Sequence, residues 1–169
     1  MAWWVVGIMG LGLGGCGTAA KMKRLSAVEQ DHFQALRVWM EDDQEKAFLK
    51  LKTEAERDQY LKEIKVWERF YQYSESERKA ILGGDVKPGF KQDQVYMAWG
   101  EPHLRNRLTG REAERSELLV YRFEVDEDGL VRVWTPDSKT AYKAVEQYRV
   151  ELILDNAKVA EITEKKGWE

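Results

Sequence analysis

The chain has 169 residues, of which 43% are hydrophobic and 34% are charged, and this balance is typical of a folded globular domain rather than a disordered chain. Its 27 basic and 30 acidic side chains leave a net charge of −3, which excludes the strong positive bias of many nucleic-acid-binding proteins. A single cysteine excludes an internal disulfide and a cysteine-built zinc site. The length allows one domain with a substantial core, or at most two small domains.

The N-terminus has the pattern of a secretory signal. Residues 1–20 carry no charged side chain, and the apolar run over 3–13 is too short to span a bilayer but suits the apolar region of a signal peptide. The single cysteine, Cys16, directly follows Leu13-Gly14-Gly15, a stretch that resembles the lipobox of bacterial lipoproteins.

That resemblance implies a signal peptide over 1–15, cleavage between Gly15 and Cys16, acylation of the Cys16 thiol, and a tether over 16–26. Gly17 stands where an Asp commonly retains such proteins at the inner membrane. The resemblance therefore implies a lipid-anchored protein of the outer membrane whose domain faces the periplasm.

The charge pattern keeps a second interpretation open. No Lys or Arg precedes the apolar run, and the first charges, Lys21, Lys23 and Arg24, follow it. The positive-inside rule is also satisfied by an uncleaved N-terminal anchor whose domain faces the cytoplasm.

Residues 27–84 are predicted to form a helical region, because proline and glycine are absent until the Gly-Gly pair that ends it. In the first helix, Phe33, Leu36 and Met40 recur at helical spacing and share one face.

Two capping patterns mark further helix starts within this region. Thr53 with Glu56, and Ser74 with Glu77, have the spacing of capping boxes. The helix that begins at Thr53 is predicted to continue to about residue 73. It carries a stripe that is expected in the core, made of Tyr60, Ile64, Trp67 and Tyr71.

After Gly110 the period changes to the alternation of half-buried strands. The segments "ELLVYRFEV" (117–125), "LVRVW" (130–134), "YRVELIL" (148–154) and "VAEIT" (159–163) are separated by the turn sequences "DEDG" and "DNAK". The fold class is therefore α+β, with N-terminal helices followed, over 85–164, by a short helix and an antiparallel sheet of three to four strands. The last residues, 165–169, are predicted to be a peripheral tail.

Between the two halves lies "PGFKQDQVYMAWGEP", in which Gly89, Val95, Gly100 and Pro102 have a distinctive spacing. Gly89 is expected to open a turn, the following helix to carry Val95 inward, and Gly100 to end the helix with positive φ before Pro102.

This spacing resembles the corresponding segment of the SmpA/OmlA (BamE-type) small outer-membrane lipoproteins, over roughly residues 84–163. Phe90 and Lys91 depart from it, because the family usually has Met and Thr there. A fainter likeness, carried by "FLKLKTEAERDQYL" and "QVYMAWGEP", is to GWxTD-domain proteins, although their signature motif is absent.

The sequence contains no recognisable catalytic motif, so an enzyme is not expected. His32 and His103 have no neighbour at metal-ligand spacing and are expected on the surface or in turns. No metal or other cofactor is predicted.

The segment 103–116 is rich in arginine and is interpreted either as a solvated hairpin loop or as a surface for anionic lipid headgroups or a partner's carboxylates. The resemblance to the BamE-type family implies that contacts with lipid and partner proteins lie near this loop. The residues concerned are Arg105, Arg107, Arg111 and Arg115, opposed only by Glu112 and Glu114.

Together these patterns favour a bacterial envelope lipoprotein with a non-catalytic interaction or assembly domain. Its expected partners are the membrane, through the lipid anchor, and an envelope protein, with no nucleic acid and no small-molecule substrate. The alternatives are a membrane-anchored binding protein that faces the cytoplasm and a periplasmic ligand-binding or hydrolytic protein.

Overall fold

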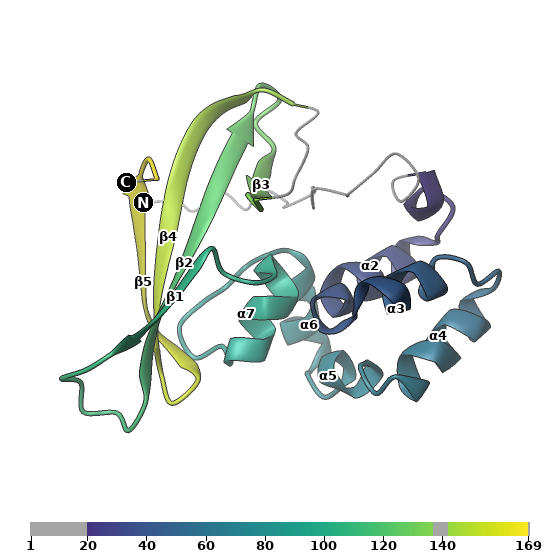
Figure 1. Cartoon of the computed structure of the whole chain (residues 1–169), viewed down its shortest axis with the longest axis horizontal. Helices are drawn as coiled ribbons and strands as arrows, with labels where there is room; N and C mark the ends of the chain where they lie inside the picture. Colours follow the sequence, from purple (N-terminus) through teal and green to yellow (C-terminus); the bar gives the residue numbers. More distant parts are fainter. Residues whose placement is uncertain (1–19, 137–141, 169) are drawn as a thin grey trace.

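The computed structural model describes residues 20–136 and 142–168 (Figure 1). Helices precede strands along the chain, which confirms the predicted α+β class. The predicted signal peptide, its cleavage site and Cys16 lie outside the described residues.

The helices are α2 (Ala27–Leu36), α3 (Asp42–Phe48), α4 (Glu54–Glu63), α5 (Trp67–Tyr71), α6 (Glu75–Leu82) and α7 (Gln92–Trp99), with the 3-10 turn η1 (Arg37–Trp39) after α2. The strands are β1 (Leu104–Leu108), β2 (Ser116–Asp126), β3 (Val131–Val133), β4 (Ala144–Asp155) and β5 (Lys158–Lys166).

The sheet is antiparallel, in the order β1-β2-β4-β5. β1 pairs with the first residues of β2, and β3 pairs with later residues of β2 on the same side. The sequence predicted three to four strands, whereas five are present among the described residues. The additional strand is β1, which lies in the arginine-rich segment and pairs Leu104 with Val120 and Leu108 with Ser116.

One face of the sheet packs against α7, which lies between the sheet and the other helices (Figure 1). Trp99, at the end of α7, meets Tyr121 and Phe123 of β2 edge-on, with ring centroids 5.1 Å apart in each pair. Its indole N–H donates to the carbonyl of Gly84 at 2.9 Å, which ties α7 to the end of α6. The two halves therefore share one hydrophobic core. The other face of the sheet, which none of the described helices covers, is called the outer face below.

The segment 88–102 folds as its spacing predicted. Gly89 turns with a φ of 92°, and Gly100 ends α7 with a φ of 77°. Between them Val95 and Trp99 are buried, and Pro102 follows outside the helix. The two predicted capping boxes are also present, because Thr53 and Ser74 accept hydrogen bonds at the starts of α4 and α6.

The prediction of one helix from 53 to 73 is wrong, because the chain breaks at Lys65. Lys65 has a φ of 60°, and the N–H of Val66 bonds the carbonyl of Leu61, which closes α4 in a left-handed turn. The break rotates the buried face, so that Leu61, Val66 and Phe70 lie in the core while Tyr71 is 38% exposed. The other three residues of the predicted stripe are only partly buried.

The predicted tail begins too early. β5 continues to Lys166, which pairs with Tyr148. Gly167, with a φ of 71°, then redirects the chain. The indole N–H of Trp168 donates to the carbonyl of Phe123 at 3.2 Å, so this residue packs on the sheet.

Candidate functional site

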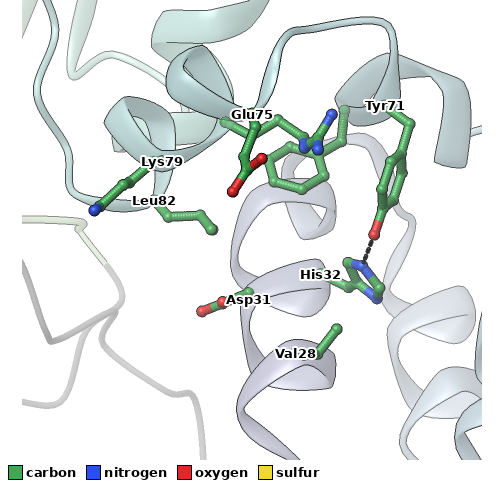
Figure 2. Close-up of a pocket in the computed structure, with 9 residues that line it drawn as sticks. Val28, Asp31, His32, Tyr71, Glu75, Lys79 and Leu82 are labelled. Atoms are coloured by element: carbon green, nitrogen blue, oxygen red, sulfur yellow. Dashed lines mark hydrogen bonds between the residues drawn. The ribbon is translucent and has the colours of Figure 1, made fainter.

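A groove of about 250 Å³ opens between α2, α5 and α6 (Figure 2). Apolar side chains are part of its lining, namely Val28, Phe70 and Leu82. Val28 is 49% exposed although it is a large aliphatic residue. Together with the exposed ring of Tyr71, this side chain gives the groove an apolar surface open to solvent.

The wall of the groove holds a line of three polar side chains from α2, α4 and α5. His32, only 3% exposed, contacts the hydroxyl of Tyr71 through Nε2 at 2.6 Å, as Figure 2 shows. On its other side, Nδ1 faces Oδ1 of Asp58 at 3.4 Å. Because a carboxylate only accepts, this arrangement favours the proton on Nδ1 and a hydrogen bond donated by the Tyr71 hydroxyl to Nε2.

The electrostatics of this line oppose proton transfer from Tyr71 to His32. Burial lowers the pKa of His32, and the nearby carboxylates, Asp58 first among them, only partly oppose that effect. Burial, reinforced by the charge of Asp58, raises the pKa of Tyr71. A base that activates a hydroxyl needs the reverse of these shifts. The contacts of this line fix the Tyr71 ring at the groove wall.

Aromatic packing also fixes this wall of the groove. Trp67 stacks on Tyr71 with ring centroids 4.2 Å apart, and it meets the His32 ring edge-on at 5.0 Å. The guanidinium of Arg78 lies 5.0 Å from the centroid of the Tyr71 ring and donates a hydrogen bond to the carbonyl of Tyr73. Tyr71 is thus held on three sides although its ring edge reaches solvent.

Charged side chains of both signs also line the groove. Asp31 and Glu75 supply carboxylates, while Arg78 and Lys79 supply cations (Figure 2). Burial raises the pKa of the Asp31 carboxyl. Such a lining suits a ligand that carries both apolar and charged groups.

The groove rests on a buried ion pair below α2. Glu29, one turn before His32, pairs with Arg57 of α4, and both side chains are buried. Glu29 also accepts the N–H of Ser26, while Arg57 donates to the carbonyl of Leu51. This pair connects the helix that carries His32 to the helix that carries Asp58.

The segment 103–116 forms a hairpin, in which the largely exposed strand β1 pairs with the start of β2. Arg105 and Arg107 belong to β1, and Arg105 makes a two-pronged contact with Glu117, at 3.1 and 2.9 Å. Arg115 donates to the same carboxylate at 2.9 Å. Arg107 is exposed and makes no ion pair among the described residues.

The remaining arginine of this segment, Arg111, bridges two strands. It contacts Asp155 of β4 at 2.9 and 2.8 Å and Glu161 of β5 at 2.8 Å. The hydroxyl of Ser116 also donates to Asp155, at 2.6 Å. Three of the four arginines are therefore engaged within the chain, and their role toward a lipid or a partner stays a prediction.

Sequence reasoning missed the groove. The prediction that His32 lies on the surface or in a turn is wrong, because it is buried in α2. A signal was present: Glu29 and His32 fall on the helical face of Phe33 and Leu36, where a surface helix keeps its apolar side. The partners Asp58 and Tyr71 come from distant segments and had no local signal.

Within the described ranges, no group of three or more His, Cys, Asp or Glu side chains is placed to hold a metal ion. The helices of this part are all too short or too polar to cross a membrane. Comparisons with known proteins found no matching family model, no similar curated protein and no matching solved structure.

Proposed function

We propose that the chain is a non-catalytic interaction module of the bacterial envelope, tethered through Cys16, whose helical groove receives a segment of a partner protein. The observation that carries this proposal is the groove itself, where Val28 is exposed beside the ring of Tyr71, which His32 and Trp67 hold in place. The site combines exposed apolar side chains with charges of both signs, a combination that suits a docking surface.

The size of the groove favours a side chain over a free small molecule. Its volume of about 250 Å³ lies below the roughly 300–1,000 Å³ of pockets that enclose a drug-sized ligand. One aliphatic or aromatic anchor fits beside Val28, and flanking charges of the partner complement Asp31 and Lys79. These features favour a peptide segment over the alternative of a periplasmic ligand-binding protein.

The position of the groove along the chain agrees with a membrane tether. Val28 follows Cys16 by 12 residues. Even when fully extended, a chain of that length spans only about 40 Å at ~3.3–3.6 Å per residue. If Cys16 carries the lipid, the groove stays close to the membrane and meets partners that are anchored there.

The tether and the groove are tested separately. Cys16→Ser is expected to leave an unprocessed precursor without acyl label, since only a thiolate forms the thioether. Normal processing and labelling of that variant would contradict the tether.

For the groove, Val28→Asp is compared with Val145→Asp in quantitative affinity purification of the full chain from envelope extracts. Val145, on the sheet, is 59% exposed, so the two variants introduce the same charge at similarly exposed valines. A partner that is lost with Val28→Asp and retained with Val145→Asp supports docking at the groove. Identical partner profiles for both variants and the wild type contradict it.

A further inference from the structure

Three cations lie side by side across the outer face of the sheet. Arg122 of β2 is directly opposite Arg149 of β4, and Arg149 is directly opposite Lys165 of β5. Like charges in directly opposed positions destabilise a sheet, because their side chains are close neighbours. This row, defined as Arg122, Arg149 and Lys165, is therefore a feature that stability alone does not favour.

One carboxylate serves two members of the row. Glu151 accepts a hydrogen bond from Nε of Arg149 at 2.9 Å and one from Nζ of Lys165 at 2.7 Å. Arg122 forms no ion pair with any residue that the structure describes. The next outward carboxylate along β2, Glu124, accepts its hydrogen bonds from Tyr142 and Gln147 instead. The row and Glu151 thus carry an excess of two positive charges, and the Glu124 carboxylate, whose donors are neutral, lowers the excess to one over this part of the face.

Two indoles hold the Arg122 guanidinium in place. Its Cζ lies 5.5 Å from the ring centroid of Trp134 and 5.1 Å from that of Trp168, while the two rings lie 5.1 Å from each other. His103 meets Trp134 edge-on at 5.3 Å. Aromatic faces fix a guanidinium without using its N–H donors, so the planar fork of Arg122 stays available for an acceptor.

We propose that Arg122 and Arg149 form a binding site for the phosphate group of a soluble molecule. Two guanidinium forks offer more donors than one carboxylate accepts, and a phosphate monoester brings about −1.5 to −2 charges and three acceptor oxygens to match the excess. The Arg149 side chain is only 18% exposed, and two indoles stand beside Arg122. Partly covered guanidinium groups favour a small soluble ligand over the flat surface of a bilayer. This site is independent of the groove between the helices.

The test is calorimetric titration of the full chain with inorganic phosphate, at an ionic strength held constant with chloride. Arg122→Gln is expected to weaken phosphate binding at least tenfold, and Lys165→Gln to weaken it a few-fold. The matched control is Arg69→Gln, because Arg69 also lies over an indole, 4.4 Å from the Trp39 centroid, but belongs to the helical half. This control is expected to bind phosphate as the wild type does.

Thermal unfolding supplies a second readout that does not depend on a variant remaining soluble at calorimetric concentrations. Phosphate should raise the unfolding temperature of the wild type and of Arg69→Gln, but not that of Arg122→Gln. Equal effects of acetate and phosphate, or equal effects on all variants, would overturn the proposal. Arg122-dependent binding to vesicles of anionic phospholipid without binding of inorganic phosphate would overturn it too.

Discussion

Replacing Arg57 by Ala should cost about 3–5 kcal/mol in the free energy of unfolding, because it leaves one charge buried without its partner. Glu29 is 4% exposed and Arg57 is 8% exposed, so water cannot take the place of the lost guanidinium without opening the helical layer. The N–H of Ser26 still bonds Glu29, but the carbonyl of Leu51 loses the donor that Arg57 supplies. Urea unfolding followed by circular dichroism measures the change.

A double variant separates the ion pair from the packing of the arginine stem. The double variant Glu29→Gln, Arg57→Met removes both charges and keeps much of the buried volume, so it should be more stable than Arg57→Ala alone. The exposed pair Lys46–Asp43, with side chains 66% and 96% exposed, is the control. Lys46→Ala should cost roughly 0–1 kcal/mol.

The same pair predicts a pH dependence. Burial acts to raise the pKa of Glu29, but hydrogen bonds from Ser26 and Arg57 outweigh burial and hold the pKa below 4.5. A carboxyl with a lowered folded-state pKa contributes stability above its unfolded pKa and loses that contribution as the pH falls through the folded value. The wild type should therefore lose more stability than the double variant between about pH 5 and about pH 2. Two results would refute the reasoning about this pair. One is a cost of Arg57→Ala no larger than that of Lys46→Ala. The other is an equal loss of stability by the wild type and the double variant as the pH falls.

Three further changes test other parts of the fold. Phe123→Ala should cost about 3–5 kcal/mol in urea unfolding, because Phe123 is buried between Trp99 and Tyr148, and a cost below about 1 kcal/mol would contradict this packing. Gly100→Val should cost about 1–3 kcal/mol through backbone strain alone, since φ is 77° and no atom lies within 4 Å of an added Cβ; a neutral result would argue against the positive φ. Because burial lowers the pKa of His32 below 6.5, stability should fall as the pH drops below that value, and His32→Gln should remove this slope in urea titrations.

The parts of the fold that the sequence predicted are those with local causes. Thr53 and Ser74 cap helices through residues three positions away, and Gly100 ends α7 through its own φ, so each signal lies within one turn of chain. The break at Lys65 had no such signal. Lys is a good helix former, and the left-handed turn at this residue lets Leu61 and Val66, which flank the break, both lie in the core.

The candidate site depends on contacts between distant segments. His32 meets Asp58 and Tyr71 only after α4 and α5 fold back on α2, and no spacing along the chain encodes that meeting. The ion pairs of the arginines in 103–116 likewise could not be predicted from the local sequence. Arg111 finds Asp155 44 positions away, so a count of neighbouring carboxylates could not foresee its ion pair.

The two outermost strands determine how the molecule behaves toward copies of itself. β1 and β5 end the main order of the sheet, and an unprotected sheet edge is a template for pairing with another chain and for aggregation. β1 reads "LRNRL" and β5 reads "KVAEITEKK", so both edges are rich in charge. Edge-to-edge pairing with a second copy would bring Arg107 or Lys166 against like charges and remove them from water. The arginines of β1 therefore oppose pairing of this edge with a second copy.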